Sequence, residues 1–219
     1  MQESVLTAGR DLADASAAAI LAHGRGGSAE GMLELARAIG GRDVAWLAPQ
    51  ARGGQWYPYS FLAAIDSNEP WLSASLDTLD RLVSRCAEAG LTAERVALAG
   101  FSQGACLASE YAARNARRYG GLVILSGGLI GPPGTPREYA GSLAGTPVLL
   151  GCSDVDPHIP VERVHETARV LSSMGADVDL RIYPGLGHTV VDDEIAAAAR
   201  ILEGIPSGTT RTGLDREEG

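Results

Sequence analysis

Short apolar runs alternate with amphipathic segments along most of this chain. The runs carry small and branched apolar side chains at consecutive positions, which is typical of strands that are covered on both faces. Buried strands are predicted at residues 17–24, 44–49, 96–99, 122–127 and 147–151, and a last strand is predicted at residues 178–185. Residues 5–7 are compatible with an additional edge strand.

Between these strands, apolar residues recur three and four positions apart, which is the spacing of one helix face. One helix follows Ser28, a favourable N-cap residue, and stops at Gly40 and Gly41. A longer helix starts near Trp71 and places Cys86 on its apolar face, which predicts a core residue rather than a reactive thiol. Further helices are predicted at residues 105–113, 161–171 and 191–203.

Strands that alternate with helices, without a hairpin between them, predict a parallel sheet that is covered by helices on both faces. A length of 219 residues accommodates one such domain with a full core. We predict a single α/β domain at residues 1–203, followed by a polar tail at residues 204–219.

One serine lies at the junction of a predicted strand and a predicted helix, in the segment GFSQG at residues 100–104. This GxSxG pattern, in this strand and helix context, is that of a nucleophile elbow. Such an abrupt turn brings backbone close to Gly100 and Gly104, where a side chain would clash. The backbone N–H of Gln103, at the positive end of the helix, is suited to stabilising an oxyanion. A chance GxSxG is common in a glycine-rich chain, but the flanking elements favour Ser102 as a nucleophile.

A serine hydroxyl needs a base to take its proton and a third group to orient that base. Reactive groups gather beyond the carboxyl ends of parallel strands, and this favours His188, which follows the last predicted strand. His165 lies within a predicted helix, and His23 ends the first strand, where it would orient the next loop. His158 precedes the last strand and is the weaker candidate for the base.

The loop after the fifth predicted strand contains two candidate acids, Asp154 and Asp156. Either could orient His188. A proline stiffens the turn directly after Asp156, and this residue lies closer to the next predicted helix, so Asp156 is favoured. The resulting order of serine, acid and histidine along the chain is that of α/β-hydrolases.

Residues 50–70 form a long connection without clear periodicity, and such loops are often functional. The loop contains the aromatic residues Trp56, Tyr57, Tyr59 and Phe61. Because it follows a parallel strand, we expect it to overhang the nucleophile. Trp56, Tyr57 and Phe61 are candidate substrate-binding residues, with Trp56 as the leading wall residue. The alternative is a hydrophobic anchor that only holds the loop in place.

The composition excludes several classes of function. A formal net charge of −9 argues against nucleic-acid or anionic-membrane partners. All 18 Lys and Arg positions are arginine, which excludes enzymes that need a lysine amine, such as PLP enzymes and Walker-type NTPases. The sequence shows neither a membrane span nor a secretory signal, and its three cysteines lack metal-type spacing. We predict no metal, no cofactor and a cytoplasmic location.

Four motifs follow one another along the chain: HGRGG at residues 23–27, GFSQGA around Ser102, DPHIP at 156–160 and GLGH at 185–188. Together they resemble the phospholipase/carboxylesterase family of small α/β-hydrolases, which includes acyl-protein thioesterases and is similar to dienelactone hydrolases. The resemblance covers residues from about 17 to 203. It implies the α/β-hydrolase fold, with one mostly parallel sheet and little or no lid.

The resemblance also implies a cytosolic serine esterase in which Arg25 and Gln103 donate backbone N–H groups to the oxyanion. Dienelactone hydrolases use a cysteine nucleophile, so Ser102 points to the esterase branch. Ser153 is a departure, because relatives often carry glycine three residues before the acid, and a second aspartate follows it here. That departure leaves the choice of acid open.

We therefore predict a serine hydrolase that cleaves a carboxylic ester through an acyl-enzyme, with Ser102, Asp156 and His188 as its catalytic residues. Thioesters and lactones are alternative substrates. A non-catalytic small-molecule-binding protein on the same fold is the alternative from another class. The expected partner is a small ester, and the sequence leaves a homodimer open.

Overall fold

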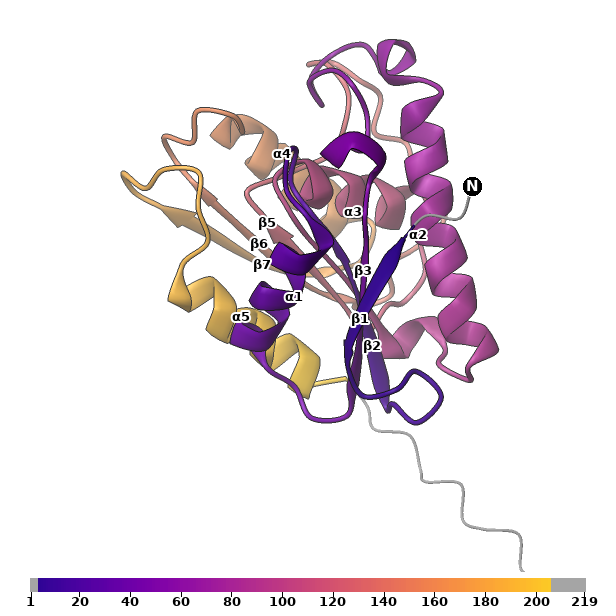
Figure 1. Cartoon of the computed structure of the whole chain (residues 1–219). Coiled ribbons are helices and arrows are strands. Elements are labelled where there is room, and N and C mark those ends of the chain that lie inside the picture. Colours follow the sequence, from indigo (N-terminus) through magenta and orange to yellow (C-terminus); the bar gives the residue numbers. More distant parts are fainter. Residues whose placement is uncertain (1–3, 206–219) are drawn as a thin grey trace, which may run out of the picture.

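Residues 4–205 are described by the computed structural model, in which one seven-stranded sheet runs through the molecule (Figure 1). Its strands are β1 (Val5–Gly9), β2 (Ala17–Ala22), β3 (Val44–Pro49), β4 (Val96–Phe101), β5 (Gly121–Leu125), β6 (Pro147–Ser153) and β7 (Asp177–Tyr183). They are ordered β1-β3-β2-β4-β5-β6-β7. β1 pairs with β3 in antiparallel fashion, and the other neighbours are parallel. The predicted, mostly parallel sheet is confirmed, with β1 as its antiparallel edge.

Helices cover both faces of the sheet. They are α1 (Ala29–Ile39), α2 (Trp71–Glu88), α3 (Gln103–Arg114), α4 (Val161–Ser173) and α5 (Asp192–Glu203). α1 and α5 lie on one face, and α2, α3 and α4 lie on the other (Figure 1). α1 begins as predicted, with Ser28 Oγ accepting a hydrogen bond from the Gly31 N–H at 3.2 Å. It ends at Gly40, whose φ of 73° suits glycine.

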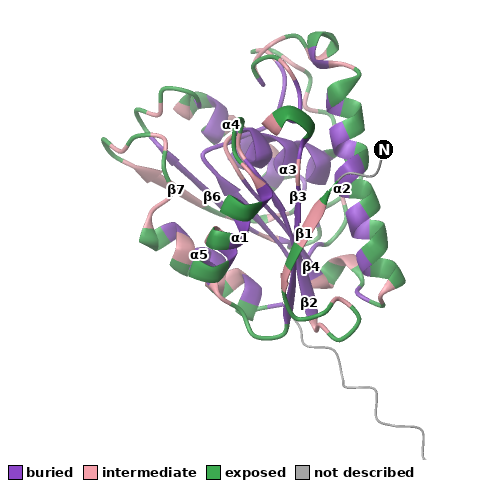
Figure 2. Ribbon diagram, in the orientation of Figure 1, coloured by how far each residue is buried: buried purple, intermediate pink, exposed green. Residues whose placement is uncertain are grey.

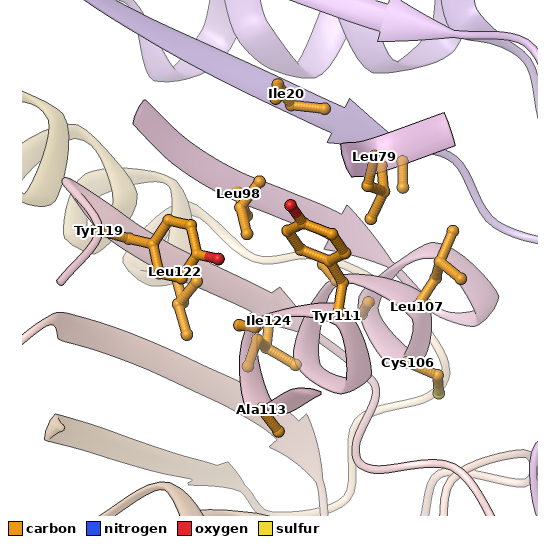
Figure 3. Close-up of a cluster of buried hydrophobic side chains, with 14 of the residues drawn as sticks. Ile20, Leu79, Leu98, Cys106, Leu107, Tyr111, Ala113, Tyr119, Leu122 and Ile124 are labelled. Carbon is orange, nitrogen blue, oxygen red and sulfur yellow. The ribbon is translucent and has the colours of Figure 1, made fainter. Parts of the chain in front are cut away.

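The core consists of two apolar layers, one on each side of the sheet, and the outer faces of the helices carry the exposed residues (Figure 2). In the larger layer, Ile20, Leu98 and Leu122 of the sheet lie beneath Leu107 and Tyr111 of α3 (Figure 3). These five side chains are at most 1% exposed. Cys86 belongs to this layer, and burial raises the pKa of its thiol to about 11, as expected for a core residue.

The order of the strands explains where a site forms. From β2 the chain first passes to β3 on one side and later to β4 on the other. The loops that leave the carboxyl ends of β2 and β4 therefore diverge, and such switch points are where ligands bind in open α/β sheets. Ala22 pairs with Gly100 across these two strands. This register brings the loop after β2 alongside Ser102.

Most predicted strands and helices begin or end within one or two residues of the observed ones, and two further features differ from the sequence predictions. The connection at residues 50–70 contains two short 3-10 helices, η1 (Arg52–Gly54) and η2 (Ile65–Asn68), and a third, η3 (Ala93–Arg95), precedes β4. Of the predicted tail, Ile205 is buried beside Gly120, and residues 206–219 lie outside the described residues. Within residues 4–205, no helix is long and apolar enough to cross a membrane.

Candidate active site

Ser102 occupies a strained turn between β4 and α3. Its φ of 55° and ψ of −119° are unusual for a residue with a side chain, and such strain is concentrated at functional sites. The turn is anchored to the neighbouring strand, because the Ser102 N–H donates to the Leu125 carbonyl of β5 at 2.9 Å. A Cβ added to Gly100 would lie 2.4 Å from Gly104 backbone, and one added to Gly104 would lie 2.0 Å from the Ala22 oxygen. The close backbone approach predicted for these two glycines is therefore present.

His188 and Asp156 are brought together from two different loops. His188 Nδ1 lies 2.7 Å from Asp156 Oδ2. The other carboxylate oxygen accepts hydrogen bonds from the backbone N–H groups of His158 at 2.8 Å and Ile159 at 3.1 Å. Burial alone would raise the pKa of Asp156, but these hydrogen bonds outweigh it and hold the pKa below its ordinary value. Asp156 is therefore an ionised acceptor that can fix the orientation of the imidazole.

Asp154, the alternative acid, has a different contact. Its Oδ1 accepts a hydrogen bond from the Gly185 N–H at 2.8 Å, at the start of the GLGH turn. The neighbouring Ser153 donates its hydroxyl to the Leu186 carbonyl in the same turn. Asp154 and Ser153 thus connect the loop after β6, which carries Asp156, to the loop after β7, which carries His188. Sequence reasoning treated both residues only in relation to the choice of acid and missed this role.

Two rings flank the imidazole of His188. The Phe101 ring lies 4.7 Å away between centroids, and the His158 ring lies 4.9 Å away in an edge-on arrangement. His158, the weaker candidate for the base, is thus a neighbour of the favoured one. His165 is exposed on α4, in accord with its placement within a helix.

His23 orients the loop after β2, as expected for a histidine at the end of that strand. Its Nδ1 lies 2.7 Å from the Gly24 carbonyl, and its Nε2 accepts a hydrogen bond from the Ala51 N–H at 3.0 Å. Burial lowers the pKa of His23. The neutral imidazole, with the proton on Nδ1, satisfies both contacts.

Ser102, His188 and the loop after β2 meet around a cavity of about 590 Å³. Arg25 and Gln103 line it, and Gln103 opens α3, where backbone N–H groups have no partner within the helix. A Cβ added to Gly24 would lie 3.3 Å from Ser102 Cβ, so the Arg25 loop directly adjoins the nucleophile. Among residues 4–205, His, Cys, Asp and Glu side chains form no cluster of three that could hold a metal ion.

The aromatic loop, residues 55–61, forms one wall of this cavity, but Trp56, the predicted leading wall residue, is not part of that wall. Tyr57 and Phe61 line the cavity, as expected. Trp56 is 3% exposed and is not among the described residues that line it. Its indole N–H donates to the His23 carbonyl at 2.7 Å, and its ring lies 5.0 Å from the His23 ring. Trp56 is therefore an anchor that fixes the loop to the end of β2, and its assignment as a wall residue is wrong.

Comparisons with known proteins agree with this geometry. A family model described as Phospholipase/Carboxylesterase matches residues 9–205. Acyl-protein thioesterase 1 of Saccharomyces cerevisiae is 26% identical over 208 residues, which covers 84% of this chain and 90% of that protein. Acyl-protein thioesterase 1 of Gibberella zeae is 30% identical over 120 residues, and that match covers 52% of this chain and spans about half of that protein, 49%.

A solved phospholipase/carboxylesterase from Dyadobacter fermentans superposes with a TM-score of 0.88 at 40% sequence identity and covers 92% of this chain and 97% of that one. A carboxylesterase from Bacillus cereus, at 19% identity, shares the fold with a TM-score of 0.74 over 92% of this chain and 93% of that one. Since the family model spans nearly the whole of the described fold, the chain belongs to the phospholipase/carboxylesterase family.

Proposed function

We propose that this protein is a serine esterase that cleaves carboxylic esters by way of an acyl-enzyme. The observation that carries the proposal is the 2.7 Å contact between His188 Nδ1 and Asp156, beside a cavity that His188 shares with Ser102. Because Nδ1 donates to the carboxylate, Nε2 is the nitrogen that can accept the proton of the serine hydroxyl.

In the proposed reaction, Ser102 Oγ attacks the ester carbonyl while His188 Nε2 takes its proton. Asp156 stabilises the imidazolium that forms, and its lowered pKa keeps it ionised for this task. The backbone N–H groups of Arg25 and Gln103 stabilise the negative charge on the carbonyl oxygen. His188 then returns the proton to the leaving alcohol, and a water molecule cleaves the acyl-enzyme by the same steps in reverse.

The cavity favours an uncharged acyl group. Tyr57, Phe61, Phe101 and Ile159 supply the apolar part of its lining, which is suited to contact with an uncharged acyl chain. The names of the yeast and Gibberella relatives support thioesters as a second substrate class, because esters and thioesters form the same acyl-enzyme. The cytoplasmic location and the homodimer left open by the sequence stay predictions.

A fluorophosphonate probe tests the proposal, since it reacts with an activated serine. We expect stoichiometric labelling of the wild-type protein and none of Ser102→Ala, with circular dichroism showing the same folded state for both. A folded wild-type protein that does not label would instead favour the binding-protein alternative.

A further inference from the structure

The aromatic loop is held by the side chain of Arg25 at the rim of the cavity. Arg25 Nη1 donates to the Gln55 side-chain oxygen and, at 3.0 Å, to the Pro58 carbonyl. Arg25 Nη2 donates to the carbonyls of Tyr57 at 2.9 Å and Tyr59 at 2.8 Å. Four acceptors on one short loop therefore engage the four terminal N–H groups of the guanidinium.

Gln103 holds the same loop from the buried side. Its Oε1 accepts a hydrogen bond from the Trp56 N–H at 3.0 Å, and its Nε2 donates to the Tyr57 carbonyl at 2.8 Å. The side chain is 6% exposed. Tyr57 O is thus a shared acceptor, on which the side chains of Arg25 and Gln103 converge.

We propose that Arg25 and Gln103 are positioning residues, whose side chains fix the oxyanion donors against the loop that forms the acyl wall. This inference rests on the proposed function, in which the backbone N–H groups of these two residues bind the oxyanion. Each residue would then donate to the oxyanion through its backbone N–H, and its side-chain hydrogen bonds, called braces below, would hold the loop. The two braces end on one segment, residues 55–59, so the oxyanion hole and the wall keep a fixed geometry relative to each other.

The arrangement has a consequence for how Arg25 acts. A guanidinium whose terminal N–H groups are all engaged by the protein is not free to bind a charged substrate group in bidentate fashion. Arg25 holds the loop because its planar guanidinium presents a fork of N–H donors that reaches several loop carbonyls at once. A lysine carries the same charge but cannot reproduce that fork.

Arg25→Lys separates a role of the positive charge toward the substrate from a role of the guanidinium hydrogen bonds in holding the loop, because it retains the charge and removes the fork. We expect kcat for a short aryl ester to fall about 10- to 100-fold, the range expected for displaced catalytic groups. We also expect the Tyr59 N–H, which donates to the unmutated Asn68 at 2.9 Å, to exchange with deuterium about 10-fold faster. Gln103→Met, which keeps the backbone N–H and removes both side-chain hydrogen bonds, should reproduce both effects.

Arg118→Lys is the matched control. Arg118 donates to the Ala144 carbonyl at 2.6 Å, and it precedes β5, at the end of the sheet away from Ser102. Neither kcat nor exchange of Tyr59 should change in this variant. Circular dichroism on all variants verifies that they fold, and Gln103→Met carries the test if Arg25→Lys does not.

Three results would overturn the proposal. Unchanged kcat and unchanged exchange would show that the braces are dispensable. A fall in kcat without faster exchange would mean that Arg25 acts on the substrate directly. Faster exchange with normal kcat would mean that the loop does not position the oxyanion donors. Failure of the wild type to label with fluorophosphonate would refute the proposed function instead. The exchange measurement would still show whether the side chains of Arg25 and Gln103 hold residues 55–59 in place.

Discussion

At the scale of single residues, two aspartates that lie two positions apart, Asp154 and Asp156, have different contacts in the site. Asp156 contacts His188, and Asp154 contacts the Gly185 N–H. The sequence favoured Asp156 from the proline that follows it, which is a statement about local stiffness. Which carboxylate reaches the histidine depends on how two loops approach each other, and local stiffness does not determine that.

Substitution of the two acids separates these tasks. Asp156→Asn should lower turnover on the order of 10⁴-fold, because an amide no longer holds the imidazole in the required tautomer. Asp154→Asn retains an oxygen that can accept from the Gly185 N–H, so its turnover should stay close to that of the wild type. Steady-state kinetics on both variants check this, and a large loss in Asp154→Asn alone would reverse the assignment.

The base is tested in the same way. His188→Ala should cost about 10⁴ to 10⁶ in turnover while the fold stays intact, because residues of a triad act as a unit. Thermal unfolding monitored by circular dichroism provides the folding control. Near-normal turnover of His188→Ala, together with loss of turnover in His158→Ala, would assign the base to His158 instead.

We expect Glu194 to make the stability of the fold depend on pH. Its side chain is 1% exposed, Oε2 accepts from the Val191 N–H at 3.0 Å, and Oε1 has no hydrogen-bond partner among the described residues. Burial raises its pKa from 4.5 to about 7, although the hydrogen bond from Val191 opposes the shift. The folded protein therefore binds more protons than the unfolded chain between these values, and stability falls as pH rises through that range.

Glu194→Gln should remove this dependence. Relative to the wild type, we expect the free energy of unfolding of the variant to increase by about 3 kcal/mol between pH 4.5 and pH 8. Urea unfolding at several pH values measures the difference, in which contributions from other groups cancel. A difference that stays constant with pH would show that Glu194 is not the responsible group.

At the scale of elements, the loop at residues 50–70 shows both the reach and the limit of sequence reasoning. Its position over the cavity follows from its place after a parallel strand, and Tyr57 and Phe61 line the cavity. Aromatic content alone does not show which ring faces the substrate. The indole of Trp56 has a polar partner at the end of β2, the His23 carbonyl, and such a contact between distant segments is invisible in the sequence.

Phe61 and Trp56 should therefore respond differently to truncation. Phe61→Ala should change the ratio of kcat/KM between short and bulky esters by about 10- to 200-fold, which corresponds to about 1 to 3 kcal/mol, because it alters contacts in the proposed acyl pocket. Trp56→Ala should lower stability by about 3 to 5 kcal/mol and leave that ratio nearly unchanged. A substrate screen with thermal unfolding tests both, and a changed ratio in Trp56→Ala alone would restore it as a wall residue.

The junction of β2, β4 and α3 should tolerate no side chain at Gly104. An added Cβ would lie 2.0 Å from backbone oxygen of Ala22, and backbone cannot rotate away as a side chain can. We expect Gly104→Ala to destabilise the protein by about 3 kcal/mol or more. Gly31→Ala, near the start of α1 and with nothing nearer than 3.8 Å, is the control and should be neutral or stabilising. Equal stabilities in chemical denaturation would contradict this packing.

At the scale of the whole molecule, the sequence predicted most of the fold because the inner parallel strands are mostly apolar runs, whereas the parallel edge strand β7 alternates apolar with charged residues. β2 and β3 show this, since both are buried along their full length. β1 is only partly buried and pairs with β3 rather than with β2, its neighbour in the chain. Its direction depends on pairing with a segment about 40 positions away, so no local pattern could predict it.

The same global arrangement explains how distant motifs form one site. Parallel strands place the loops after β2, β4, β6 and β7 at one end of the sheet, and these loops carry Arg25, Ser102, Asp156 and His188. The chain order of the motifs could be recognised in the sequence. Their hydrogen bonds, such as those from Ser153 and Asp154 to the GLGH turn, required the three-dimensional arrangement.

The central claim is that the reaction passes through an acyl group on Ser102, and mass spectrometry of the protein quenched during turnover of a p-nitrophenyl ester tests it most directly. The account predicts a burst of one p-nitrophenol per protein and an acyl adduct on the peptide that contains Ser102. Ser102→Ala should show neither. Turnover of the ester by Ser102→Ala at the wild-type rate, or an acyl adduct on another residue, would contradict the account.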